Sequence, residues 1–461
     1  MPPSERRRSF WERLALAAPL AIFVIVYAPA VGHGFIADDF RWVVESRVDR
    51  VGKIPALFLR NTGFYRPIVA LTFAANDAMF GNRPLGYGVT NLILAGVCAV
   101  LLAVLIRTLG LPREAAIAGS AVWLMNFHGI DMAILWISGR TALVLIAASL
   151  ITAIALLRGH VVLAAAGLLT ALLAKEEAVA LPFVLFAWLM IRARSVPEPA
   201  SKRFAWIAVS VLSLVAYWQL RQRSGAFTVN TAPPYYHLTF SPALIVENGL
   251  QYADRALTFP AAICLAAWLL LRPGWSAIRW APEILACGVV WILGGYALTV
   301  FLPVRSSLYS CFPSIGSAIV AAWCCAEFWR RSEPAARRRA VAASIVISAA
   351  LLPVYRARAH RWIDPADLSS SVLAQLRTLT ADVPDGAHVV LIDDRSKRVN
   401  LESTFGSLMN DAYTLSTGRS IDIWIDPPVA SAVLAGLAPP CASCVALKLR
   451  LEDGTVRRSR D

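Results

Sequence analysis

Two adjacent carboxylates, Asp38 and Asp39, follow directly after the first apolar run of the chain. A carboxylate beside an acceptor hydroxyl can act as a general base that removes its proton, and a second carboxylate can position the acceptor or balance the charge of the site. The pair could instead cap the next helix, because Asp is favoured at a helix N-terminus and its charge suits the helix dipole there. Without further context the capping interpretation is favoured.

Charged residues between the later apolar runs form a second set of candidates. Lys175 and Glu176 separate two short runs, and such charges are expected to face water or a partner, because a charge at the bilayer centre costs about 2.5 to 3.5 kcal/mol on insertion scales. Taken singly, each is an ordinary loop charge. Together the cations predict an anionic substrate such as a lipid phosphate, since Arg binds phosphate oxygens in bidentate geometry and Lys adds a compact charge. The other basic candidates are Arg66, His128, Arg140 and Arg305.

A metal or redox site has less support. Adjacent Asp residues could join a site for a divalent cation, but no accompanying ligand spacing supports one, so a metal requirement stays open. Cys441 and Cys444 lie in a Pro-Pro and strand context that lacks the helix of redox motifs, which favours a local structural disulfide or two plain thiols.

The composition indicates a membrane protein. Of the 461 residues, 57% are apolar and 16% are charged, where a soluble domain carries about 25% charge. The net charge of +14 comes mostly from short Arg-rich segments between apolar runs. Basic residues placed between apolar runs indicate which segments lie on the cytoplasmic side of a membrane, and we expect no nucleic-acid partner.

The apolar runs between residues 14 and 354 predict about eleven transmembrane helices. With the N-terminus in the cytoplasm, the basic segments 107–113, 158, 192–203, 272–279 and 330–339 fall inside, as the positive-inside rule requires. This assignment needs a break at residues 175–177, because a single helix over 161–191 would invert all later segments. A cleaved signal peptide is the alternative for the first run, 14–31. The predicted outer segments are 34–84, 128–140, 175–177, 221–255, 303–307 and the C-terminal part of the chain.

The long apolar runs end at residue 354, and a more polar segment follows. Segments 389–392, 421–425 and 445–451 have the pattern of strands separated by Gly, Pro and Asp turns. We therefore expect an all-α polytopic membrane domain over residues 1–355, whose long first outer loop is 34–84, and a small α/β domain outside the membrane over residues 356–461. Within the loop, 54–60 and 68–80 could lie as helices in the membrane interface.

Short motifs with polar residues follow one another along the predicted membrane domain. They are Ala37-Asp38-Asp39-Phe40, Tyr65-Arg66-Pro67, Gly86-Tyr87 through Asn91, Trp136 through Arg140, Ala174-Lys175-Glu176 with Ala178 and Pro182, and Arg305 through Leu308-Tyr309 to Pro313-Ser314 and Gly316. In this order they resemble the motifs of the GT-C superfamily of polyprenyl-phosphate-sugar glycosyltransferases. The resemblance is to bacterial relatives of the protein O-mannosyltransferases and of the transmembrane tetratricopeptide-repeat mannosyltransferases, and it covers roughly residues 30 to 320.

The resemblance implies an inverting transfer of a hexose, such as mannose, from a polyprenyl-phosphate carrier at the periplasmic face of a bacterial inner membrane. The acceptor could be a protein, a glycan or a lipid. Asp38 or Asp39 would act as the base, and cations would stabilise the leaving phosphate. The residues implied in carrier or substrate binding are Tyr65, Arg66, His128, Arg140, Lys175, Glu176, Arg305 and Tyr309.

The chain departs from the family pattern at two points, which limits how far the roles of family residues apply to it. His128-Gly129 with Asp131 stands where family members often have His-Pro followed by a glutamate, and no tetratricopeptide repeats follow the last apolar run. The alternative function is a non-catalytic binder or flippase of lipid-linked sugars. A transporter should place ionisable groups near the membrane midplane, whereas the topology gathers them at one surface.

Overall fold

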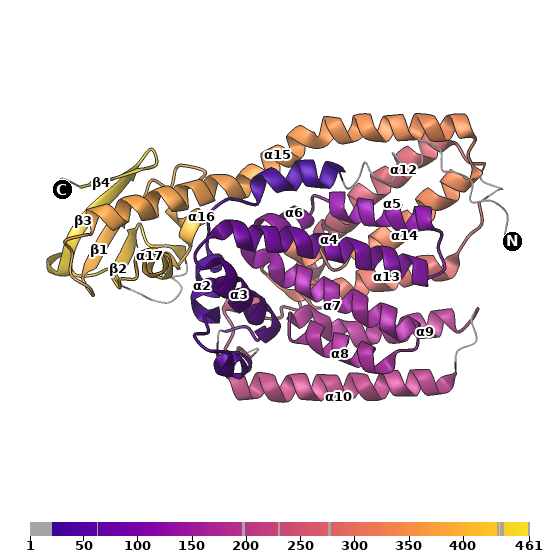
Figure 1. The fold of residues 1–461 in the computed structure, drawn as a ribbon, viewed down its shortest axis with the longest axis horizontal. Helices are drawn as coiled ribbons and strands as arrows, with labels where there is room; N and C mark the ends of the chain where they lie inside the picture. Colours follow the sequence, from indigo (N-terminus) through magenta and orange to yellow (C-terminus); the bar gives the residue numbers. More distant parts are fainter. Residues whose placement is uncertain are drawn as a thin grey trace.

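The computed structural model describes residues 21–61, 63–195, 199–228, 231–274, 278–430, 433 and 438–459. A bundle of helices carries a small sheet domain at one end (Figure 1). The prediction of an all-α membrane protein with a C-terminal α/β domain is confirmed. Residues 14–20 of the first predicted crossing lie outside the described residues.

The helices of the bundle follow the apolar runs closely. Several are shorter than a bilayer crossing requires, as the run lengths predict. Their bounds are α2 (Asp38–Ser46), α3 (Pro67–Phe80), α4 (Pro84–Thr108), α5 (Arg113–Met125), α6 (Ile130–Leu135), α7 (Arg140–Leu157), α8 (Val161–Leu172), α9 (Leu181–Arg192), α10 (Ala200–Ser224), α11 (Pro242–Ala253), α12 (Phe259–Leu271), α13 (Pro282–Tyr296), α14 (Ser314–Arg331) and α15 (Pro334–Leu379).

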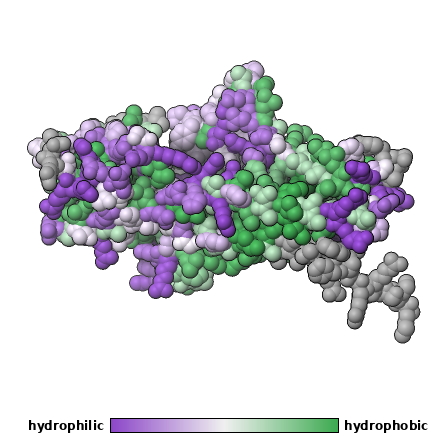
Figure 2. Space-filling model, turned by 90° about the horizontal axis from the view of Figure 1, so that it is seen from above, coloured by the Kyte–Doolittle hydropathy of each residue, from purple (hydrophilic) through white to green (hydrophobic). Residues whose placement is uncertain are grey.

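Five described helical stretches are long and apolar enough to cross a membrane. The stretch that contains α7 has 83% of its apolar window buried and lies at the centre of the bundle, whereas the corresponding share for α15 is 11%. Figure 2 shows the hydrophobic surface of the bundle between two hydrophilic ends, one of which is the sheet domain. The five stretches are Pro84–Thr108, Ile137–Leu157, Ala200–Ser224, Pro242–Leu271 and Pro334–Leu379.

The predicted break at Lys175 is present. Helix α8 ends at Leu172, Lys175 is extended with φ −163° and ψ 146°, and a 3-10 turn, η4 (Glu176–Ala180), leads into α9. Pro182 occupies the first turn of α9, where N–H groups have no acceptor within the helix, so its missing N–H costs no helical hydrogen bond. The charged residues at the break are therefore held between two helix ends.

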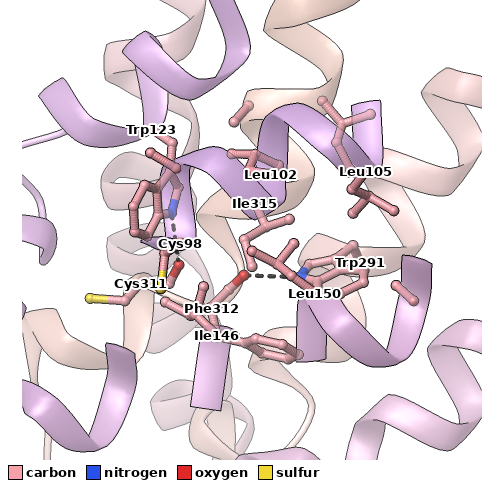
Figure 3. Close-up of a cluster of buried hydrophobic side chains, with 14 of the residues drawn as sticks. Cys98, Leu102, Leu105, Trp123, Ile146, Leu150, Trp291, Cys311, Phe312 and Ile315 are labelled. Carbon is pink, nitrogen blue, oxygen red and sulfur yellow. Dashed lines mark hydrogen bonds between the residues drawn. The ribbon is translucent and has the colours of Figure 1, made fainter. Parts of the chain in front are cut away.

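Two tryptophans in the core fix the chain between α14 and the short turn η9 (Ser307–Ser310). Trp123 of α5 donates its ring N–H to the carbonyl of Cys311 at 3.4 Å, and Trp291 of α13 donates to that of Phe312 at 2.9 Å (Figure 3). Buried indole N–H groups need such partners. The segment that follows Tyr309 is consequently anchored to two helices.

The C-terminal sheet has the strand order β2-β1-β3-β4. The buried Val389 and Leu391 alternate with partly buried neighbours along β1, as a strand that faces a core requires. Three strands were predicted from the sequence, whereas the short, polar β4 was missed. The strands are β1 (His388–Ile392), parallel to both β2 (Asp422–Asp426) and β3 (Val445–Glu452), and β4 (Thr455–Arg458), antiparallel to β3.

The link between the two parts is helical. Helix α15 runs without interruption across residue 355, the expected domain boundary, and packs against the sheet domain's short helices α16 (Leu401–Phe405) and α17 (Met409–Thr417). Cys441 and Cys444 form a disulfide with their Cα atoms 5.2 Å apart, which is one of the two predicted states.

Candidate active site

The Asp38-Asp39 pair opens helix α2, directly after a tight turn. The N–H of Asp39 donates to the carbonyl of Ile36 at 3.0 Å, and the cap residue Ala37 has φ +43° and ψ −125°. Neither Asp caps the helix through its side chain, but both lie in the first turn, where their charges suit the helix dipole.

The Asp39 carboxylate is fully buried and bound on both oxygens. Its Oδ1 accepts from the N–H of Ser138 at 2.7 Å and from the Ser138 hydroxyl, and its Oδ2 accepts from the N–H of Ile36 at 3.1 Å. Burial raises the pKa of Asp39 to about 7, against the bonds from Ser138 and Ile36, which act to lower it. Asp39 therefore joins the first outer loop to the turn before α7.

The Asp38 carboxylate is exposed at the rim of the same turn. Within the part of the chain that the structure describes, it makes no hydrogen bond and no ion pair. Loss of hydration against the surrounding protein raises the pKa of Asp38, while Arg41 and Arg66 act to lower it. Of the two acids, Asp38 has the carboxylate that is available to a ligand.

Arg66 and Glu176 form a bidentate ion pair between the first outer loop and the break after α8. The Nη2 and Nε atoms of Arg66 lie 2.9 Å and 3.1 Å from Glu176 Oε2. Burial opposes the charge of Glu176, but the Arg66 guanidinium outweighs it and holds the pKa of Glu176 below its usual value. At the end of α10, Arg221 Nη1 lies 3.9 Å from Glu176 Oε1.

Two further cations are paired with glutamates. Lys175 Nζ lies 2.7 Å from Glu177 Oε2, with both side chains buried, and 5.1 Å from the centre of the Tyr309 ring. Arg305 Nη2 lies 2.6 Å from Glu247 Oε2 of α11. Each of the three pairs is neutral in sum. The pairs Arg66–Glu176 and Arg305–Glu247 join segments that the sequence predicts to be outer, whereas Lys175–Glu177 lies within one such segment.

Comparisons with known proteins identify the fold. No family model and no curated protein sequence matches the chain. The crystal structures of ArnT from Cupriavidus metallidurans, bound to undecaprenyl phosphate or in the apo state, match with TM-scores of 0.53 and 0.56 at 13% and 12% identity, over 96% of this chain and 93% of ArnT. The Archaeoglobus fulgidus oligosaccharyltransferase matches with a TM-score of 0.50 at 12% identity, over 91% of this chain and 65% of that protein. Both neighbours have the GT-C fold. This chain has the GT-C fold too.

Several predicted site residues are brought together in this GT-C chain. Arg66 interacts electrostatically with Asp38, Glu177 and Tyr309, which places the first outer loop, the break at 175–177 and the turn η9 around one region. The predicted residues in this region are Asp38, Arg66, Lys175, Glu176 and Tyr309. Arg305 lies next to this region, because Tyr252 interacts electrostatically with both Glu177 and Arg305.

Arg140 is not part of that region. Its side chain is fully buried, its Nε donates to Asn91 Oδ1 at 2.8 Å, its Nη2 donates to the Tyr87 carbonyl at 2.9 Å, and its guanidinium lies over the Phe73 ring at 4.4 Å. Arg140 thus ties α7 to α4, and each of its three nitrogens donates a hydrogen bond to another part of the protein. We leave it out of the proposed carrier site.

His128 and Tyr65 also have other neighbours. His128 stands beside Asp131, whose Oδ2 pairs with Arg358 Nε of α15 at 2.8 Å, and burial together with Arg358 lowers the pKa of His128. The hydroxyl of Tyr65 donates to the Phe58 carbonyl at 3.1 Å. The Tyr65 hydroxyl is thus committed to the loop before α3, whereas the His128 ring packs against the Phe127 ring, with centroids 4.6 Å apart.

Sequence reasoning missed Arg221 and Tyr236. Burial raises the pKa of Tyr236 to about 12, while Arg66 acts to lower it, so its ring stands beside the Arg66 pair. A signal for Arg221 was present: the arginines at 221 and 223 stand in a segment predicted to be outer, against the charge bias that is expected to place basic residues inside. Among the described residues, no group of three or more His, Cys, Asp or Glu side chains could hold a metal ion.

Proposed function

We propose that the chain is a membrane glycosyltransferase that moves a sugar from a polyprenyl-phosphate carrier to an acceptor on the outer side of the membrane. The observation that carries the proposal is the division of roles between adjacent acids. Both oxygens of Asp39 accept hydrogen bonds from Ser138 and Ile36, whereas Asp38 is exposed near Arg66 and has no hydrogen bond or ion pair to any residue that the structure describes. The similarity to a GT-C protein crystallised with undecaprenyl phosphate supports a lipid-linked donor.

In this proposal Asp38 is the general base. It takes the proton from an acceptor hydroxyl, whose oxygen forms a bond to the anomeric carbon of the sugar while the bond from that carbon to the carrier phosphate breaks. The electron pair of the broken bond stays on the phosphate oxygen. Attack from the face opposite the phosphate inverts the configuration at that carbon.

The leaving phosphate gains negative charge, and cations that already stand in place stabilise it without reorganisation. Arg66 uses Nε and Nη2 for Glu176, so its Nη1 remains available, and Arg221 stands on the other side of the same glutamate. Lys175 and Arg305 are held by Glu177 and Glu247, so a phosphate that binds them must share them with those carboxylates.

The finer assignments belong to the same proposal. The sugar would be a hexose such as mannose, and the site would face the periplasm of a bacterial inner membrane. These assignments rest on the motif resemblance and on the bias of basic segments toward one side of the predicted crossings.

The decisive experiment uses the purified full-length chain in liposomes that contain polyprenyl-phosphate sugars labelled in the sugar. We expect label in an acceptor and stoichiometric release of polyprenyl phosphate when an extract of cell-envelope acceptors is supplied. A flippase would move the intact labelled lipid to the inner leaflet without releasing polyprenyl phosphate, and that result would replace this proposal by the alternative.

A further inference from the structure

The residue directly before Asp38 has an unusual backbone conformation. Ala37 has φ +43° and ψ −125°, and the Asp39 N–H donates to the Ile36 carbonyl at 3.0 Å, so residues 36–39 form a tight turn whose second residue lies in a region favoured by glycine. A side chain with a Cβ is strained there, and such strain persists only where the surrounding structure holds it. The direction in which Asp38 leaves the turn depends on this conformation.

The C-terminal domain contacts this turn. The N–H of Ala37 donates to the carbonyl of Thr404, in α16, at 2.8 Å. The ring of Phe40, in the first turn of α2, stacks on Phe405 with centroids 5.9 Å apart and an interplanar angle of 26°, and both rings are buried. Consecutive residues of α16 thus hold the chain on both sides of Asp38.

The contact is part of a shared core. Phe35 and Phe40 of the first outer loop belong to the same buried cluster as Val389 and Leu391 of β1 and Tyr413 of α17. In Figure 1, α2 lies beside α16 and α17 where the sheet domain meets the bundle. The hydrophobic core of the C-terminal domain therefore extends into the loop that carries Asp38.

The opposite side of the turn is fixed by the membrane bundle, through the bonds from Ser138 to Asp39. The turn is held between two bodies. The N–H of its strained residue, Ala37, donates to the C-terminal domain, while its carbonyl accepts from the Phe40 N–H within α2. Release of that domain would allow Ala37 to return to a negative φ, which would turn the Asp38 carboxylate away from Arg66.

We propose that the C-terminal domain is a positioning element for the base of the transferase: the carbonyl of Thr404 and the ring of Phe405 hold Ala37 in its strained conformation and so aim Asp38 at the site. The inference rests on the proposed function. It assigns to this domain a role in the chemical step and makes Phe405 a positioning residue.

Variants of the full-length chain test this inference in the liposome transfer assay. Phe405→Leu should lower kcat by about tenfold or more while KM for the carrier lipid stays unchanged, because a misplaced base affects the chemical step. Ala37→Gly adopts the same turn without strain, so the double variant Ala37→Gly, Phe405→Leu should recover most of the lost kcat. Val389→Ala, in the same core but away from the turn, is the control for loss of domain stability.

A second readout does not depend on activity. Amide hydrogen exchange of the peptide that covers residues 34–40 should be faster in Phe405→Leu than in wild type and should slow again in the double variant. A kcat loss equal in Phe405→Leu and Val389→Ala, or no recovery in the double variant, would overturn the inference. If wild-type protein transfers no sugar, the proposed function fails, whereas the exchange pattern still decides whether the domain holds the turn.

Discussion

At the scale of single residues, the sequence identified the acidic pair but could not separate its members. Their roles diverge because of contacts that are distant in sequence: Ser138, 99 residues away, occupies one oxygen of Asp39. Arg140 illustrates the same limit, since its motif suggests a phosphate ligand while its acceptors are an asparagine and backbone carbonyls of α3 and α4. Residue type and spacing do not show which way a guanidinium points.

Replacement of Asp39 should affect stability. In Asp39→Asn one of the donors from Ile36 or Ser138 must face an amide N–H, and a buried polar group without its partner costs about 1–3 kcal/mol. We expect a lower midpoint of thermal unfolding in detergent, with Ser138→Ala showing a smaller decrease. An Asp39→Asn protein as stable as wild type would show that these bonds do not hold the loop.

The pH dependence of transfer should report Asp38. A base must be deprotonated, so the rate falls as the pH drops through the pKa of Asp38, and Arg41 acts to keep that pKa low. Arg41→Gln should therefore move the acidic limb of the kcat profile to higher pH. Lys53→Gln, at an exposed pair with Asp49, is the control and should leave the limb in place. An unchanged limb in Arg41→Gln would remove Asp38 as the titrating group.

At the scale of elements, the break between α8 and α9 was predictable and its internal pairing was not. Charges at 175–177 interrupt an apolar run, which predicts two helices. The positive-inside rule also requires two helices here, because one long helix would move the later basic segments to the outer side. The sequence offers two glutamates to Lys175, however, and the structure pairs it with Glu177 while Glu176 turns to Arg66. Lys175 is extended and Glu176 begins the 3-10 turn η4, a local conformation that the residue types alone do not specify.

The Lys175–Glu177 pair gives a prediction for stability. Both side chains are buried, so Lys175→Met leaves an uncompensated carboxylate and should destabilise the protein by about 3–5 kcal/mol. The double variant Lys175→Met, Glu177→Met should recover most of that loss, because two apolar side chains can replace a buried pair. Thermal unfolding of the two single variants and the double variant measures the coupling. Additive losses would contradict a direct interaction.

At the scale of the whole molecule, the fold class followed from composition and run lengths, because the bilayer restricts crossings to apolar helices of a certain length. The packing of the C-terminal domain onto the first outer loop could not be predicted, since Phe40 and Phe405 are joined only by tertiary structure. The strand pattern predicted the sheet but gave no indication of what its helices contact.

The orientation of the bundle can be tested by cysteine labelling. In a background without the six unpaired cysteines, a membrane-impermeant maleimide should modify Asp453→Cys, at an exposed hairpin of the C-terminal domain, in intact spheroplasts. Ser195→Cys, after α9, should react only after permeabilisation. The reverse pattern would place the Asp38 region in the cytoplasm and contradict the predicted topology.

The most direct test of the central claim compares Asp38→Asn with wild type in the liposome transfer assay, at matched protein amount and with carrier binding measured on the same samples. We predict that Asp38→Asn binds the polyprenyl-phosphate sugar as wild type does and unfolds at the same temperature, while its transfer rate falls by about 10²-fold or more, the contribution expected of a general base. Transfer at the wild-type rate by a folded Asp38→Asn protein would contradict the assignment of Asp38 as the base.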